Sequence, residues 1–199
     1  KVLCSLLLFL SISCGLQGRN ANYARDSKRI WLDSKEIHHG EYVWKMKKAG
    51  DVISSAEKVS TLGYDTSDWL SAIVPGTVLN SLVYNKEYPE PYYGVNNKLE
   101  SGKIPDISKV GREFYTYWFR TEFDVPESFA GKTIWLQPDG VNYRAEIWVN
   151  GNLLSTLNGM FISDYINVTD FVKVGRTNIL AFKVYPVDVP GTTMPKSWG

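Results

Sequence analysis

The chain has 199 residues, of which 44% are hydrophobic and 22% are charged, and its formal net charge is +1 at pH 7. This length and balance indicate one globular domain and exclude a disordered chain. The near-neutral charge, without a basic run, excludes a nucleic-acid-binding surface and a basic membrane-surface helix. Aromatic residues make up 14% of the chain, which favours β-structure and also suits a protein that handles sugars, because an aromatic ring can cover the C–H face of a sugar.

The first residues differ from the rest of the chain. The stretch Val2–Ile12 is almost wholly apolar, follows Lys1 and precedes small residues, which is the layout of a secretory signal peptide and is too short for a membrane span. We therefore expect a signal peptide over residues 1–14, a polar tether over 15–30, and export to the periplasm or the cell surface. A buried strand or helix is the alternative interpretation of the same stretch.

Both cysteines, Cys4 and Cys14, lie in this stretch, so the domain after it holds no disulfide. Leu10–Cys14 loosely matches a bacterial lipobox, in which the Cys becomes the lipidated first residue of the mature protein. Lipidation at Cys14 and plain cleavage both stay open. Membrane association is expected only through the signal peptide or this lipid anchor.

The rest of the chain, residues 31–199, alternates short apolar runs with turns. Period-two alternation predicts half-buried strands at Tyr42–Lys47, Leu70–Val74, Tyr115–Val125, Lys132–Gln137, Arg144–Val149, Asn152–Thr156 and Asn178–Tyr185. Asn150-Gly151 predicts a hairpin turn, since both residues tolerate positive φ. One helix of about two turns is expected after Thr77, a suitable N-cap, with apolar residues at helical spacing. This pattern predicts an all-β jelly-roll sandwich with one short helix.

The strand Tyr115–Val125 shows two faces. Tyr117, Phe119 and Phe123 fall on the apolar face, and the opposite face carries Trp118, Arg120, Glu122 and Asp124. We expect Glu122 and Asp124 to be solvated.

No complete catalytic set is visible in the sequence. His38 and His39, the two histidines, are adjacent in a polar stretch, and no spacing of His, Cys, Asp or Glu indicates a metal site. Glycoside hydrolysis needs two carboxyl groups across a cleft, and no pair stands out. We therefore expect no cofactor, no metal and no activity from this chain alone.

Four segments carry a specific resemblance. They are Asp68-Trp69 with Val74–Leu79, Tyr88–Asn97, Gly111-Arg112 with Tyr115–Phe123, and Gly140–Gly151 with Gly159–Phe161. Together they resemble the N-terminal, galactose-binding-like jelly roll of glycoside hydrolase family 2, and they are most similar to its exo-β-D-glucosaminidase and β-mannosidase-like branch.

The resemblance implies a larger enzyme. In this family the catalytic glutamates lie in a TIM barrel that follows an immunoglobulin-like domain, and neither is contained in the sequence. The chain is therefore expected to be the non-catalytic N-terminal domain of an exported glycosidase, truncated at its C-terminal end. That enzyme hydrolyses terminal β-linked glucosamine or mannose residues, and this domain helps to shape its substrate pocket. The expected partners are the carbohydrate substrate and the chain's own downstream domains.

Three residues are candidates for contact with the sugar. Asn96 and Tyr93 lie in the loop that resembles the family's Tyr-Tyr-Gly-x-Asn run, and Asp188 lies in a loop that matches the family near residue 190. A turn-capping role for Asn96 is the alternative. Two other functions also stay open: a stand-alone carbohydrate-binding module with Trp118, Trp135 and Trp148 as an exposed platform, and a structural surface sandwich without sugar affinity.

Overall fold

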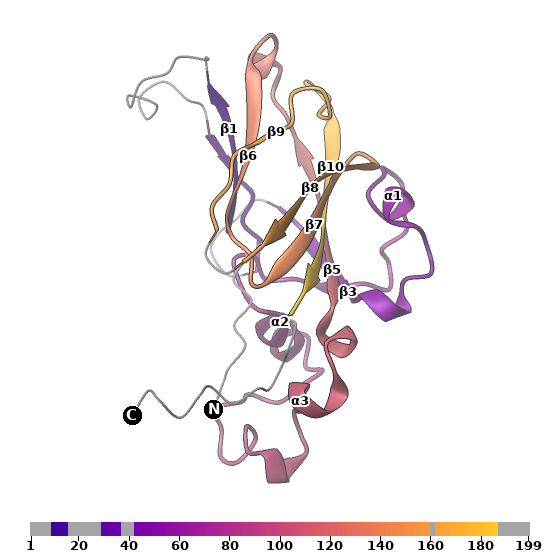
Figure 1. Ribbon diagram of the computed structural model, residues 1–199, viewed down its shortest axis with the longest axis vertical. Helices are drawn as coiled ribbons and strands as arrows, with labels where there is room; N and C mark the ends of the chain where they lie inside the picture. The colour runs from indigo at the N-terminus through magenta and orange to yellow at the C-terminus, as the bar shows by residue number, and fades with distance from the viewer. Residues whose placement is uncertain (1–8, 16–28, 37–41, 160–161, 187–199) are drawn as a thin grey trace.

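The protein folds as two antiparallel sheets packed face to face (Figure 1). The computed structural model describes residues 9–15, 29–36, 42–159 and 162–186. The four-stranded sheet has the order β2-β1-β6-β9, and the six-stranded sheet has the order β4-β3-β5-β10-β7-β8. The strands are β1 (Phe9–Gly15), β2 (Arg29–Trp31), β3 (Trp44–Lys48), β4 (Leu70–Ser71), β5 (Tyr117–Asp124), β6 (Thr133–Gly140), β7 (Arg144–Val149), β8 (Asn152–Asn158), β9 (Ile166–Asn167) and β10 (Thr177–Tyr185). The predicted all-β jelly-roll class is confirmed.

The main core lies between the two sheets. It is built from alternate positions of the strands, such as Phe119 of β5, Phe182 of β10 and Leu136 of β6, all of which are almost fully buried. The apolar positions of the period-two alternation are therefore the ones that face the core between the sheets. The buried Trp44 indole donates to the carbonyl of Leu32 at 2.7 Å, so this large ring carries no unsatisfied donor.

The helix and the hairpin form where the sequence predicts them. Helix α2 (Val78–Tyr84) begins after Thr77, whose hydroxyl accepts a hydrogen bond from the Asn80 amide at 2.8 Å. The β7–β8 hairpin turns at Asn150 (φ 48°) and Gly151 (φ 85°). The left-handed conformation of both residues explains the Asn-Gly pair at this turn.

The outer face of the six-stranded sheet differs from the prediction. Trp118 is 3% exposed and Trp148 is 8% exposed, because a segment of residues 49–69 covers them with Val59 and Trp69. This covering segment contains the 3₁₀ turn η1 (Ala49–Asp51) and the one-turn helix α1 (Ala56–Val59). Trp118 and Trp148 therefore belong to a second small core, and the proposal that they form an exposed platform is wrong.

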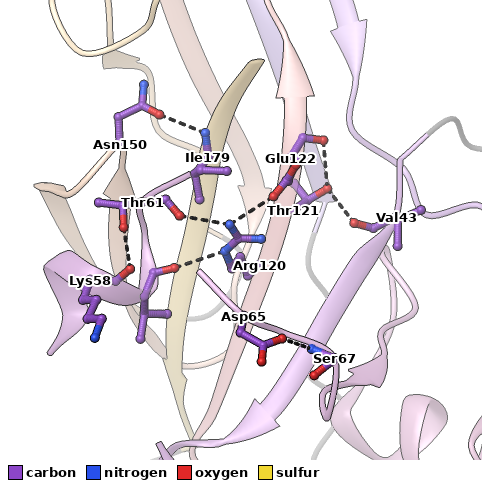
Figure 2. A network of polar contacts seen from close by, with 11 residues as sticks. Val43, Lys58, Thr61, Asp65, Ser67, Arg120, Thr121, Glu122, Asn150 and Ile179 are labelled. Atoms are coloured by element: carbon purple, nitrogen blue, oxygen red, sulfur yellow. Dashed lines mark hydrogen bonds and ion pairs between the residues drawn. The ribbon is translucent and has the colours of Figure 1, made fainter. Parts of the chain in front are cut away.

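A buried arginine fastens the covering segment to the sheet. Arg120 of β5 is 3% exposed. Its guanidinium donates to the carbonyls of Val59 and Thr61, each at 3.1 Å, and to the Glu122 carboxylate at 3.1 Å (Figure 2). Arg120 thus ties together two segments about 60 residues apart, and it is not on a solvated face. Glu122, its neighbour on that face, is half-exposed as predicted.

The N-terminal stretch is part of the four-stranded sheet. β1 falls inside the predicted signal peptide except for its last residue, Gly15, and it pairs antiparallel with both β2 and β6. For residues 9–15 the structure therefore has the strand that was the alternative interpretation, whereas removal of a signal peptide stays a prediction. The predicted tether lies largely outside the described residues.

Several short elements had no signal in the sequence. They are β9, the one-turn helix α3 (Ile107–Val110), and the 3₁₀ turns η2 (Leu99–Ser101), η3 (Glu113–Tyr115) and η4 (Glu127–Phe129). Helices α2 and α3 lie at one end of the sandwich, the end toward which β10 runs (Figure 1).

Candidate functional site

A long loop at the α2–α3 end of the sandwich carries two of the three predicted sugar-binding residues. We define residues 88–101 as the aromatic loop. Its backbone folds as consecutive i→i+3 turns, in which the amides of Tyr93, Asn96 and Lys98 donate to the carbonyls of Glu90, Tyr93 and Val95 at 3.0–3.2 Å. These hydrogen bonds hold the loop in a series of tight turns.

Asn96 holds the aromatic loop together. It is 6% exposed, its amide nitrogen donates to the Glu90 carbonyl at 2.8 Å, and its amide oxygen accepts from the Lys103 ammonium at 2.8 Å. The Ser101 hydroxyl donates to its backbone carbonyl at 3.1 Å. Both ends of the Asn96 amide are therefore occupied by the protein, which gives this residue a positioning role. Its predicted contact with a sugar stays a prediction.

Tyr93, in the same loop, faces solvent. The residue is 77% exposed, and Tyr92, Val95 and Leu99 are also exposed large apolar residues. A turn that is pinned by a buried amide thus presents a cluster of apolar side chains to water. Several exposed apolar side chains within one short loop are typical of an interaction or ligand-binding surface.

Three tyrosines connect the aromatic loop with β5: Tyr88 at the start of the loop, Tyr115, and Tyr117 at the start of β5. Tyr88 and Tyr115 interact through their side chains, and the Tyr115 hydroxyl donates to the Pro105 carbonyl at 2.8 Å. Burial raises the pKa of Tyr88 and Tyr115, and it raises the pKa of Tyr117 to about 12. All three phenols therefore stay neutral at physiological pH and can act only as neutral hydrogen-bonding groups.

The raised pKa of Tyr117 predicts alkaline sensitivity. The unfolded phenol ionises near pH 10, and the folded one ionises near pH 12, so the stabilisation is complete below pH 10 and is lost as the pH rises to 12. We expect the free energy of unfolding to fall by about 1.4 kcal/mol per pH unit from this group within that window. Urea unfolding followed by circular dichroism at pH 9, 10.5 and 11.5 measures the slope. The Tyr117→Phe variant should show a shallower slope, and an unchanged slope would contradict the prediction.

A second polar cluster lies on the outer face of β7 and β10. The Tyr185 hydroxyl donates to one oxygen of Glu146 at 2.5 Å, and the Trp148 indole donates to the other at 3.2 Å. The Arg144 guanidinium lies 4.4 Å and the Lys183 ammonium 5.5 Å from the Tyr185 ring centroid. Burial and the hydrogen bond to Glu146 raise the pKa of Tyr185.

This second cluster joins neighbouring strands. Glu146 faces Lys183 across the β7–β10 ladder. It is the one carboxylate that we describe in this cluster, and both of its oxygens accept hydrogen bonds from the protein. A hydrolytic pair needs two carboxyl groups, which the cluster does not provide. Its hydrogen bonds and ring contacts fix the outer face of the two strands.

The remaining predicted site residues are only partly placed. Asp188 lies outside the described residues. Cys14 lies in β1, and its lipidation stays a prediction. Trp135 of β6 is half-buried. Within the described ranges, no group of three His, Cys, Asp or Glu side chains could hold a metal ion, and no helix has the length and apolar character needed to cross a membrane.

Sequence reasoning missed two parts of the site. Nothing in the sequence pattern indicated Lys103, although it lies only seven residues after Asn96 and its ammonium donates to the Asn96 amide oxygen. Glu146 and Tyr185 are 39 residues apart, so only the pairing of β7 with β10 brings them together. Knowledge of that strand pairing is the signal that would have found them.

Comparisons with known proteins agree with this fold. Residues 44–192 match the family described as glycosyl hydrolase 2 galactose-binding domain-like. The mannosylglycoprotein endo-β-mannosidase of Lilium longiflorum is 39% identical over 131 residues, which cover 66% of this chain and 13% of the relative. The exo-β-D-glucosaminidase of Amycolatopsis orientalis is 30% identical over 149 residues, which cover 73% of this chain and 13% of the relative.

A solved structure supports the same assignment. The exo-chitosanase CsxA of Amycolatopsis orientalis superposes with a TM-score of 0.60 at 28% identity, covering 74% of this chain and 16% of that enzyme. The sandwich is thus a galactose-binding-like domain of the kind found in glycosidases. The chain belongs to glycoside hydrolase family 2, as the four sequence motifs predict. It spans only about an eighth of the length of the two curated relatives.

Proposed function

We propose that this chain is the non-catalytic N-terminal domain of an exported family 2 glycosidase that hydrolyses terminal β-linked glucosamine or mannose residues. The observation that carries the proposal is the similarity of one and the same domain to an exo-β-D-glucosaminidase and to an endo-β-mannosidase, both of them much longer enzymes. Action on terminal residues rests on the first of these two relatives. The hydrolytic glutamates then lie in the downstream part of the protein, together with its immunoglobulin-like and barrel domains.

In this proposal the aromatic loop forms part of the wall of the substrate pocket. Its exposed Tyr93 offers a ring face to the C–H face of a sugar, and the buried Asn96 fixes the turn that carries Tyr93. The preformed turn lowers the entropy that a mobile loop would lose when the sugar binds. Export is proposed separately, on the apolar stretch Val2–Ile12 and its flanking residues.

The test uses the full-length enzyme on p-nitrophenyl β-glucosaminide and β-mannoside. We expect release from at least one substrate, and we expect Tyr93→Ala to raise KM about 5- to 10-fold at unchanged kcat, the loss of about 1–1.5 kcal/mol of ring contact. Tyr165→Ala is the matched control, because Tyr165 is also an exposed tyrosine but lies outside the loop. Unchanged kinetics for Tyr93→Ala would remove the loop from the pocket, and binding of oligosaccharides without hydrolysis would favour a carbohydrate-binding module.

A further inference from the structure

Part of the outer face of the six-stranded sheet lies outside the small core beneath the covering segment. Strand register places six side chains of β8, β7 and β10 there in two neighbouring rows (Figure 1): Asn158, Arg144 and Tyr185 in one row, and Thr156, Glu146 and Lys183 in the next. Directly paired residues project from the same face of a sheet. We call these six residues the cationic face, and none of them belongs to the small core.

Positive charge gathers around the ring of Tyr185. The Arg144 guanidinium lies over this ring at 4.4 Å from its centroid, the Lys183 ammonium at 5.5 Å and the Arg112 guanidinium at 5.9 Å. Glu146 is the one acidic residue of the cationic face, and its two oxygens already accept hydrogen bonds from a tyrosine hydroxyl and an indole. One carboxylate beside three cations leaves an excess of positive charge, although the whole chain has a net charge of only +1.

The two cations of the cationic face keep their hydrogen-bond donors available. Within the residues that the structure describes, Arg144 and Lys183 make ring contacts but no hydrogen bond and no ion pair. An arginine that lies over an aromatic ring retains a planar fork of N–H donors that matches a carboxylate, and the ring contact restricts the orientations that binding would otherwise have to fix. Both side chains are half-buried, so salt screens a carboxylate bound to them less than it screens one on fully exposed cations.

The neighbouring edge strand supplies uncharged polar groups. Thr156 and Asn158 of β8 are exposed, and neither side chain forms a hydrogen bond in the described part of the chain. A hydroxyl and an amide both donate and accept hydrogen bonds, as recognition of sugar hydroxyls requires. The cationic face has no large apolar side chain other than Tyr185, whose ring the cations already contact. Because buried apolar anchors carry most of the affinity for protein partners, this composition favours a sugar over an acidic peptide.

We propose that the cationic face binds an acidic oligosaccharide through the carboxylates of its uronate units. The Arg144 guanidinium holds one carboxylate and the Lys183 ammonium holds a second, since these cations lie on neighbouring strands and can serve separate groups. Hydroxyls of the same sugar chain hydrogen-bond to Thr156 and Asn158, one strand spacing of about 4.8 Å beyond β7. The cationic face binds without cleaving, because its single carboxylate cannot form a hydrolytic pair, and it is independent of the hydrolysis proposed above.

Titration calorimetry of the full-length protein with three probes tests this site. The probes are tetragalacturonate, its methyl ester, which keeps the sugar rings and removes the charge, and tetra-L-glutamate, which keeps the charge and removes the sugar. We expect tetragalacturonate to bind at least about 10-fold more tightly than either of the others, because only this probe combines charge-assisted hydrogen bonds with sugar hydroxyls. Its affinity should fall as the ionic strength rises.

Two substitutions locate the bound probe on the protein. Arg144→Gln and Lys183→Gln each keep a polar side chain and remove one charge, and each should weaken tetragalacturonate binding by about 10-fold. Arg176→Gln is the matched control, because Arg176 is an exposed arginine directly before the opposite end of β10, and its replacement should leave the affinity unchanged. Urea unfolding of each variant checks that the sheet is intact, and Lys183→Gln tests the site independently if Arg144→Gln unfolds.

Every other outcome overturns the proposal. Equal affinity for the methyl ester shows that the charge is not recognised, and equal affinity for tetra-L-glutamate makes the cationic face a surface for acidic peptides. No binding of tetragalacturonate, or wild-type affinity in the folded Gln variants of Arg144 and Lys183, removes the sugar from this face, and an equal loss in Arg176→Gln reduces the effect to net charge. Hydrolysis of the p-nitrophenyl substrates is measured on the same sample: binding without hydrolysis sinks the proposed function alone, whereas hydrolysis without binding sinks the site alone.

Discussion

Replacing Arg120 with Met should lower the free energy of unfolding by about 3 kcal/mol. The substitution keeps the apolar stem that packs in the sheet but removes the guanidinium, whose three hydrogen bonds reach Val59, Thr61 and Glu122. A hydrogen bond to a charged group contributes about 1.5–3 kcal/mol, and the two carbonyls left without their donor add a desolvation cost, offset in part by water. Urea unfolding followed by tryptophan fluorescence measures the change, because Trp118 and Trp148 lie beneath the segment that Arg120 fastens.

Glu122→Gln is the matched control for Arg120→Met. It removes the charge of the one acidic partner of Arg120, whose side chain is 49% exposed, and an exposed ion pair contributes less than about 1 kcal/mol. If the two variants lower the free energy of unfolding equally, the carbonyls of Val59 and Thr61 are not what Arg120 stabilises, and the fastening role is wrong.

The inner face of the sandwich could be predicted from the sequence, whereas its outer face could not. Alternation along β5 placed Phe119 and Phe123 in the core, and both are buried there. The same alternation placed Trp118 and Arg120 on the outer, less apolar face. It could not predict that this face is buried, because the pattern of one strand carries no information about a covering segment about 60 residues earlier. Helix α1 is only four residues long, too short for helical periodicity to reveal it.

The apolar stretch at the N-terminus shows a different limit. A short apolar run fits both the apolar region of a signal peptide and a buried strand, so the run alone does not distinguish the two. In the described fold β1 pairs with both β2 and β6.

The candidate site was predictable in its location and not in its contacts. The run Tyr92–Asn96 predicted the loop through its resemblance to the family, and the structure brings Tyr93 and Asn96 into one turn. The division of roles between them depends on burial, which the loop sequence does not encode. An asparagine in a Pro-rich loop can cap a turn or face solvent, and only the packed partners Glu90 and Lys103 decide for Asn96.

Replacing Asn96 with Ala should open the aromatic loop and lower the kcat/KM of the full-length enzyme. The variant loses the hydrogen bonds to the Glu90 carbonyl and the Lys103 ammonium, a cost of about 1.4–2.8 kcal/mol, or 10- to 100-fold in the population of the open loop. Lys98 and Lys103 lie in or beside this loop, so cleavage by trypsin at these residues should accelerate by the same factor when the loop opens and closes rapidly. The loss in kcat/KM should come mainly from KM, because Asn96 positions the turn that carries Tyr93 and stands apart from bond cleavage.

Asn97→Ala controls for both readouts in the Asn96 experiment. It changes the same residue type one position along, but Asn97 is exposed, so its replacement should leave both the rate of trypsin cleavage and kcat/KM close to their wild-type values. Faster proteolysis of Asn96→Ala with unchanged kinetics would keep Asn96 as a loop anchor and remove the loop from the pocket. Weaker substrate binding with unchanged proteolysis would instead require a direct contact between the Asn96 amide and the sugar, because loop opening would then be excluded as the cause.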